Sequence, residues 1–323
     1  MATAVADLPR TEGAPPHRVP VAGIVLLLTA VVTVLLIAFA WPATRSALHD
    51  VPLAVTGPGA DQVEAGLPPG AFEVHRYPDE AAARAAIAER EVYGAVVTGP
   101  DGPTVLTASA ANATVAQALG QLATRAGAQV RDVVPAPADD PRGAGLAAGA
   151  LPLALAGIAA AALLAQLVTG RWARIAGALA FAVAGGAALA AVLRFWIGAV
   201  DGSYLALAGV LGLGLAAVSL SLLGLESVLG YAGLGLGAAV MVALGNPLSG
   251  AAVAPEMLPG GWGELGQALP PGAEVTLLRS VGFFAGNGGG TALLVLLLWA
   301  AGGLALTAAG GRARPARAGG LSH

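Results

Sequence analysis

The side chains that most often carry out catalysis are scarce in this chain. Cysteine is absent, and all 16 positions counted as lysine or arginine are arginine. These absences exclude a thiolate nucleophile, a cysteine-bound metal, a Schiff-base lysine and the lysine of a Walker phosphate-binding loop. The four histidines, His17, His49, His75 and His323, are scattered along the sequence. We therefore expect no enzyme activity, no cofactor and no metal site in this chain.

Two charged residues lie at the edges of long apolar runs, where a charge is costly and indicates function by default. Arg194 lies near the end of one run. It either contacts an anionic headgroup or substrate, or extends to the membrane interface beside Trp196. Glu226 lies between two other runs, where it either contacts a cytoplasmic partner or forms the polar turn of a helical hairpin. We favour the second, structural interpretation of both residues.

A short segment between two apolar runs is rich in arginine and tryptophan, which are enriched at protein interfaces. It contains Arg171, Trp172 and Arg174. One interpretation is that these three residues dock a separate ATPase subunit. The other is that they are only a positive-inside signal with an interfacial tryptophan. The sequence leaves both open.

The composition indicates that membrane-spanning helices position these residues. Hydrophobic residues make up 56% of the chain and charged residues 11%, whereas soluble domains have about 25% charged residues. A membrane span needs about 20 consecutive apolar residues. The sequence therefore predicts a mainly α integral membrane protein that contacts lipid, with six transmembrane helices. They fall at about 19–41 (an uncleaved signal anchor), 146–168, 175–197, 204–224, 228–247 and 290–309.

Charges return in residues 42–145, between the first two spans. Apolar runs typical of strands begin near Val51, Phe72, Val92 and Thr104. Helices are predicted after Asp79, which is a favoured N-cap residue, and over about 111–126. Strands that alternate with helices predict a small α/β domain, inserted between helices 1 and 2 as an extracytoplasmic domain.

The segment 248–289 is too apolar for an ordinary linker and too rich in proline for a span. Its pattern predicts one short amphipathic helix that lies on the membrane surface or re-enters it, although a plain long loop remains an alternative. Four apolar residues share one face of this helix. We expect them to form an outer gate: Leu277, Leu278, Val281 and Phe284.

The placement of arginine predicts the orientation. With six spans, three arginine clusters fall on one side, which the positive-inside rule assigns to the cytoplasm. Both tails, 1–18 and 311–323, are then cytoplasmic, and the first is predicted to be disordered. We expect a multi-pass protein of a bacterial cell membrane. Net charge is only −3, so nothing indicates binding of nucleic acid. The clusters are Arg10 and Arg18, Arg171 and Arg174, and Arg312, Arg314 and Arg317.

This layout resembles that of the permease subunits of ABC-2 type exporters, and is similar in particular to the phage-infection-protein type with a large first outer domain. The segments that carry the resemblance are short. Asn246–Gly250, Leu258–Pro259 and Leu269–Gly272 look like the loop before the last helix of those permeases. Ala85–Ile87 and Tyr93–Val97 look like the helix-then-strand element of their outer domain.

The resemblance implies a dimeric pore that moves lipids, polymers or drugs outward and is driven by a separate ATPase subunit. A different class of function stays open beside it. The chain would then be a non-transporting envelope protein whose extracytoplasmic domain binds a ligand or partner while the spans anchor it. Co-purification of a nucleotide-binding subunit would favour the first hypothesis.

Overall fold

The computed structural model of the chain describes residues 21–100 and 102–310. The two predicted tails, with the arginines near both termini that were used to orient the chain, lie outside the described residues. Within the described part the protein is mostly helical and has one small β-sheet. Five of its helices are long and apolar enough to cross a membrane, as expected for a multi-pass membrane protein.

These five helices correspond to five of the six predicted spans. Apolar runs of more than 20 residues form helices in a membrane. Lipid offers no hydrogen-bond partner to the backbone, and a helix pairs its backbone N–H and C=O groups within the segment itself. One boundary prediction is wrong: residues 171–174 are the first turn of a helix rather than a loop. The helices are α1 (Val21–Arg45), α5 (Ala144–Leu167), α6 (Arg171–Ala191) with its π-helical continuation η1 (Val192–Trp196), α7 (Tyr204–Leu229) and α11 (Gly290–Gly310).

The remaining predicted span, 228–247, is shorter than expected. It consists of the ten-residue helix α8 (Tyr231–Val240) and the five-residue π-helix η2 (Met241–Gly245). Helix α7 takes the residues before it, and Gly230 makes the turn with a φ of 68°. At 1.5 Å per residue this element reaches about 22 Å at most, which is less than the hydrocarbon thickness of about 30 Å.

Helix α7 is the centre of the bundle. In its most apolar 18-residue stretch, 67% of the residues are buried, whereas the corresponding share in the other four long helices does not exceed 33%. Close packing depends on small residues: a Cβ on Gly186 of α6 would lie 2.5 Å from the carbonyl oxygen of Ala208 in α7. Small residues at such contacts let helix backbones approach in the absence of a hydrophobic driving force.

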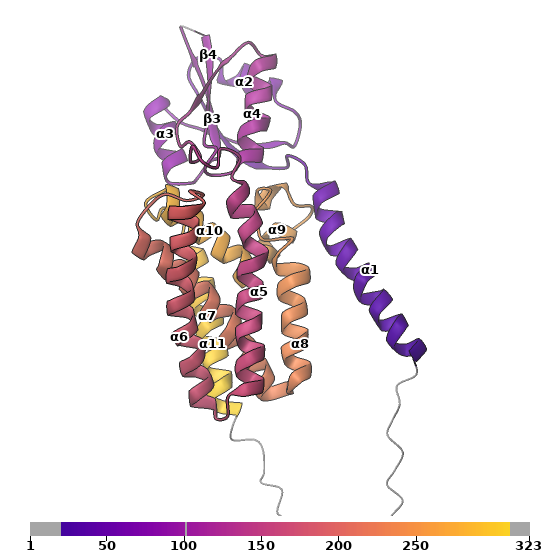
Figure 1. Cartoon of the computed structure of the whole chain (residues 1–323). Coiled ribbons are helices and arrows are strands. Elements are labelled where there is room, and N and C mark those ends of the chain that lie inside the picture. The colour runs from indigo at the N-terminus through magenta and orange to yellow at the C-terminus, as the bar shows by residue number, and fades with distance from the viewer. Residues whose placement is uncertain (1–20, 101, 311–323) are drawn as a thin grey trace, which may run out of the picture.

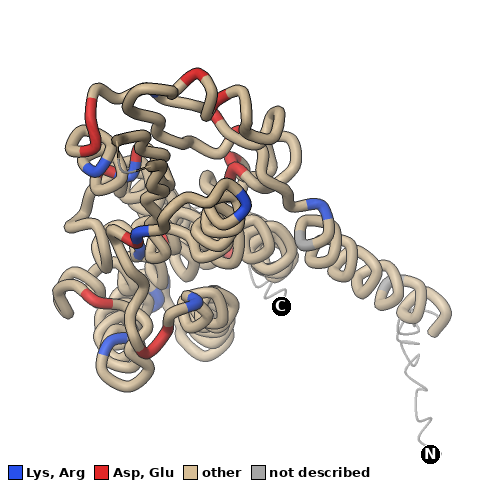
Figure 2. Tube along the Cα trace, turned by 90° about the horizontal axis from the view of Figure 1, so that it is seen from above, with Lys and Arg blue, Asp and Glu red and all other residues tan. Residues whose placement is uncertain are grey.

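Helix α1 stands apart from the other helices (Figure 1). It contacts η2, and near its end Trp41 meets the ring of Trp262 edge-on, with 5.6 Å between ring centroids. Charged residues are sparse along the helices and more frequent in the connections and the sheet (Figure 2). We call the end of the bundle that carries the sheet the sheet end and the opposite end the far end (Figure 1).

The sheet region, Val51–Asp132, lies between α1 and α5 in the sequence. Its strand order is β2-β1-β3-β4-β5. Strand β1 is parallel to β2 and β3, whereas β3 and β4 form an antiparallel hairpin and β4 is parallel to β5. The elements are β1 (Val51–Thr56), α2 (Ala60–Gly66), β2 (Phe72–Arg76), α3 (Glu80–Ala88), β3 (Gly94–Gly99), β4 (Gly102–Thr107), α4 (Ala113–Arg125) and β5 (Gln129–Asp132).

Apolar side chains fill both faces of the sheet, and each cluster also includes residues from the chain that follows η2. On one face Leu119 of α4 packs in a cluster that includes Met257. On the other, Ile87 of α3 packs in a cluster that includes Phe284. The sheet region is therefore seated on the segment 246–289, which contains η3 (Pro255–Met257), α9 (Trp262–Gln267) and α10 (Pro270–Phe283).

Candidate functional site

The segment α9–α10, which we call the hairpin, enters the helix bundle from the sheet end. Its deepest point is marked by Ala268, whose carbonyl accepts a 2.9 Å hydrogen bond from the indole nitrogen of Trp299. Trp299 lies about 14 Å along α11 from Gly290, at 1.5 Å per residue. The hairpin therefore reaches about half the length of that 21-residue helix before α10 returns toward the sheet.

The start of α10 follows from its sequence. Pro270 and Pro271 occupy the first helical turn, where their fixed φ suits a helix and a missing N–H leaves no bond unmade. Pro271 packs on Gly245, the last residue of η2; a Cβ there would lie 2.8 Å from the proline ring. A short element, α8–η2, and the tip of the hairpin thus meet inside the bundle.

Glu274 is the most unusual polar residue of the hairpin. It is 3% exposed, and its Oε1 has no hydrogen-bond partner in the described part of the chain. Its carboxyl group fills the space beside Gly214 of α7, where a Cβ would lie 2.2–2.5 Å from the carboxyl atoms. An isolated buried carboxyl group can exchange a proton or attract a cation, because its ionised form is poorly solvated.

Arg279 lies farther along the same helix, toward the sheet. It is 8% exposed, and its two terminal nitrogens donate 2.6 Å hydrogen bonds to the carbonyl oxygens of Gly250 and Ala251. No carboxylate pairs with it in the described residues. An arginine stays charged at all accessible pH, so it places a positive charge beneath the sheet.

Hydrogen bonds fasten the sheet region to the hairpin and to η3, which precedes it. Arg90 donates to the carbonyl of Thr276 at 2.9 Å, and its guanidinium lies 5.4 Å from the ring centroid of Phe284. Burial lowers the pKa of Arg90. Tyr93 donates to Glu256 at 2.9 Å, and burial, with the charge of Glu256 as the next cause, raises the pKa of this tyrosine. The phenol therefore stays protonated and remains a donor.

A cavity of about 640 Å³ lies between the sheet region and the hairpin, within the size range of ligand pockets. The hairpin contributes Gln267 and Thr276 to its lining, and a 2.6 Å hydrogen bond joins these two side chains. Its lining combines five carboxylates with two arginines, so that it suits a ligand with a polar or cationic group. The charged lining residues are Asp50, Glu73, Glu91, Glu256, Glu264, Arg90 and Arg279.

The four predicted gate residues all lie on α10 or at its end, but they do not form one exposed face. Leu277 and Leu278 are buried in the cluster of the bundle, and Val281 packs against it. Phe284 is buried in the cluster of the sheet region instead. The structure therefore divides this set between two clusters, and α10 is surrounded by protein rather than lying on a surface.

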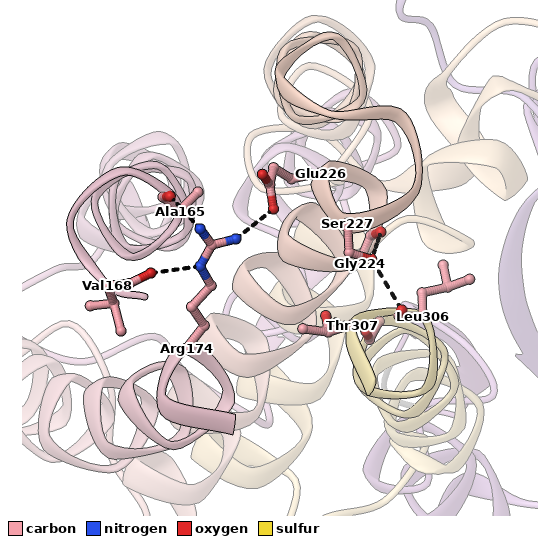
Figure 3. A network of polar contacts seen from close by, with 9 residues as sticks. Ala165, Val168, Arg174, Gly224, Glu226, Ser227, Leu306 and Thr307 are labelled. Carbon is pink, nitrogen blue, oxygen red and sulfur yellow. Dashed lines mark hydrogen bonds and ion pairs between the residues drawn. The ribbon is translucent and has the colours of Figure 1, made fainter. Parts of the chain in front are cut away.

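At the far end, Arg174 is committed to an internal network (Figure 3). It donates to Glu226 at 2.8 Å. It also donates to the carbonyl oxygens of Ala165, near the end of α5, and of Val168, the residue after this helix, at 2.7 and 2.8 Å. Glu226 lies in the last turn of α7 and only 12% of its side chain is exposed. This pair ties α5, α6 and α7 together, so that neither residue is free to dock a partner.

The other sequence-predicted site residues are placed differently. Trp172 is 63% exposed and lies beside Arg171, whose guanidinium is 5.7 Å from its ring. These two residues remain available at the far end. Arg194 lies in η1 at the opposite end, 5.5 Å from the ring of Phe195, and its Nη1 is buried without a partner in the described chain.

Sequence reasoning missed Glu274, Arg279, Arg90 and Tyr93. Glu274 carried one signal that could have found it: it is a lone acid in a proline-flanked apolar stretch. Within the described residues no group of acidic or histidine side chains could hold a metal ion. Compared with known proteins, the chain matches no family model, no curated protein and no solved structure.

Proposed function

We propose that the chain is the membrane-spanning permease subunit of an ABC-type exporter, which moves an amphipathic, lipid-like or drug-like substrate toward the sheet end and uses a separate ATPase. One observation carries the proposal. The hairpin enters the bundle to half its depth and meets the short element α8–η2 there. Interrupted helices at membrane depth occur where they are buried in protein or line a path, and they form the substrate sites of many transporters.

Two hollows of different character support an amphipathic substrate. The polar cavity lies beneath the sheet region. An apolar groove of about 430 Å³ lies between α7, α8 and α11, and Leu236, Met241 and Leu298 contribute to its walls. Trp299 lines this groove and also holds the hairpin. A substrate with an apolar tail and a polar head would find suitable surroundings on both sides of Trp299.

The arrangement also supports a direction. Helix α1 begins and α11 ends at the far end (Figure 1), where the turn with Arg171 and Arg174 lies. Positive residues favour the cytoplasmic side. We therefore place the far end in the cytoplasm, where an ATPase would bind, and the sheet region outside. Residues Arg171 and Trp172 are the proposed contact, and a second copy of the chain would complete the pore.

The test is co-purification from native membranes. The tagged full-length protein should recover a nucleotide-binding subunit, and replacing Arg171 and Trp172 together by alanine should abolish the recovery. A matched control replaces Arg142 and Trp196, an exposed arginine and an exposed tryptophan at the sheet end, and should recover the subunit normally. Equal recovery by both double variants would show that the contact is wrong.

A second candidate function is favoured by the polar cavity alone. If the wild type recovers no ATPase, the chain is better explained as an envelope protein that binds a ligand between the sheet region and the hairpin. In that case a ligand should protect the sheet region from hydrogen exchange without any nucleotide-dependent transport.

A further inference from the structure

Glu274 differs from the other acidic residue within the bundle helices. Glu226 accepts a hydrogen bond from Arg174 and forms an ion pair with it. Glu274 lies deeper, and no ion pair or hydrogen bond involves it in the described chain. A polar residue buried this deeply is expensive, so its presence needs a physical explanation.

The charged residues on and around α10 supply no counter-charge to Glu274. Helix α10 packs against α5, α7, α9, α11 and η2. The charged residues on these elements are Glu264 of α9 and Glu226 at the far end of α7, both acidic. Arg279 of α10 itself is held by the carbonyl groups of Gly250 and Ala251. Arg90 of the sheet region also reaches α10, but its guanidinium is bonded to the carbonyl of Thr276 and lies beside the ring of Phe284. Ionised Glu274 would therefore be neither paired nor solvated, which disfavours it strongly.

The space around the carboxyl group suits its neutral form. Gly214 leaves room for a carboxyl group and for little else, and apolar residues of the bundle cluster, such as Val275 and Leu278, lie beside it on the helix. We infer that Glu274 is a proton-binding site: its protonated form seats α10 against α7, and loss of the proton loosens the hairpin.

The proton reaches water when α10 loosens, and the change has an effect at a distance. Thr276 and Arg279, on other faces of the same helix, line the cavity beneath the sheet, whereas Glu274 does not. Movement of α10 would bring the carboxyl group of Glu274 to the water of this cavity, which takes the proton and leaves a carboxylate. Because Arg90 is bonded to Thr276 and Asn287 to the carbonyl of Ala88, movement of α10 would be passed to the sheet region. This inference does not depend on whether an ATPase drives the protein.

The experiment compares hydrogen exchange of the wild type and Glu274→Gln, each purified in full length in lipid nanodiscs, over a range of pH. Glutamine reproduces the neutral carboxyl group in shape. The ratio of the two exchange rates at each pH cancels the intrinsic pH dependence of amide exchange. We expect equal protection of residues 262–283 in acid and, as pH rises, faster exchange in the wild type alone. The matched control Glu264→Gln, on α9, should follow the wild type.

Infrared spectroscopy gives an independent readout. The wild type should show a protonated-carboxyl band that disappears at high pH and is missing from Glu274→Gln. Identical exchange profiles in wild type and Glu274→Gln would overturn the inference, as would a carboxyl band that persists in the variant. Failure of Glu274→Gln to fold would also overturn it, because the niche would then require the ionised group.

Discussion

Gly214 and Glu274 come from helices that are far apart in the sequence, and each explains the other. The glycine has no side chain because the carboxyl group of Glu274 occupies that space. The carboxyl group in turn is tolerated because the niche fits its neutral form and excludes other groups. Packing in protein interiors is close enough that one added carbon atom is felt.

Gly214→Ala should therefore destabilise the protein. The new Cβ would meet the carboxyl group at 2.2–2.5 Å, and overpacking of this kind costs about 1–3 kcal/mol. Gly209, in the same helix, has nothing within 4 Å of a built Cβ, so Gly209→Ala should be neutral or stabilising by about 0.5–1 kcal/mol. Unfolding in detergent micelles measures both. Equal effects of the two substitutions would mean that the niche is not tight.

The Arg174 network gives a second prediction for single residues. Arg174→Ala leaves Glu226 and two helix-end carbonyls without their partner. Breaking a pair of this burial costs about 3 kcal/mol. Arg171→Ala, one turn earlier and without such bonds in the described chain, should cost less than about 0.5 kcal/mol. Adding Glu226→Gln to Arg174→Ala should restore part of the loss, because it removes the unpaired charge. No recovery would show that the carbonyl bonds dominate.

Contacts between residues close in the sequence were predictable from the sequence, whereas contacts between distant segments were not. Asp79 caps α3 through the amide of Ala82 at 2.8 Å, as predicted. Its neighbours Glu80 and Arg84 pair one turn apart. Such contacts depend on residues three or four positions apart. The setting of Glu274 depends on Gly214, which no local pattern connects to it.

Among the elements, those with a strong local pattern were predicted best. The four strand runs correspond to β1 to β4, and the two helices to α3 and α4. Strand β5 was missed because its residues Gln129–Asp132 are all exposed and mostly polar, without the alternation of a half-buried strand. Helix α2 was missed because it has only seven residues and none of them is buried.

The prediction failed most where one apolar run is shared between two helices. Residues 228–247 are apolar enough for a span, but α7 extends to Leu229 and the rest forms the short α8–η2. The element α8–η2 is too short to cross the bundle, and its last residue, Gly245, meets Pro271 at the tip of the hairpin, which enters from the sheet end. Composition cannot distinguish these arrangements, because apolar residues suit lipid and protein surroundings equally.

At this scale we predict that Trp299→Phe loosens the hairpin. It removes the indole donor to the carbonyl of Ala268. Because Ala268 is exposed, the loss should cost about 0.5–1.5 kcal/mol, the net contribution of one hydrogen bond. Hydrogen exchange of residues 262–283 should become faster. Trp262→Phe makes the same change of size at a tryptophan whose indole nitrogen donates no hydrogen bond within the described residues. It should leave the exchange unchanged. Faster exchange in both variants would attribute the effect to lost volume.

On the scale of the whole molecule, the sheet region and the hairpin form one assembly at one end of the bundle. Arg90 donates a hydrogen bond to the hairpin itself. Bonds that involve Tyr93, Thr114 and Asn287 join the sheet region to the parts of the segment 246–289 before and after the hairpin. The far end has a compact set of turns instead, closed by Arg174 (Figure 3). The molecule is therefore asymmetric: the sheet end holds the polar cavity and the far end exposes Trp172, which is consistent with the proposed export.

The last prediction tests that asymmetry, and the absence of cysteine from the chain makes it clean. Gln121 of α4 and Thr169 of the α5–α6 turn are both exposed and lie at opposite ends of the bundle. Each can be replaced by a single cysteine and treated in intact cells with a membrane-impermeant thiol reagent. Gln121→Cys should be labelled at once, because the proposed orientation places the sheet region outside. Thr169→Cys should be labelled only after the membrane is permeabilised, because the proposed orientation places its turn, with the neighbouring positive residues, in the cytoplasm. Labelling of Thr169→Cys alone in intact cells would reverse the orientation. Labelling of both would show that the helices between them do not place these two positions on opposite sides of the membrane, and the six-span arrangement would then be wrong.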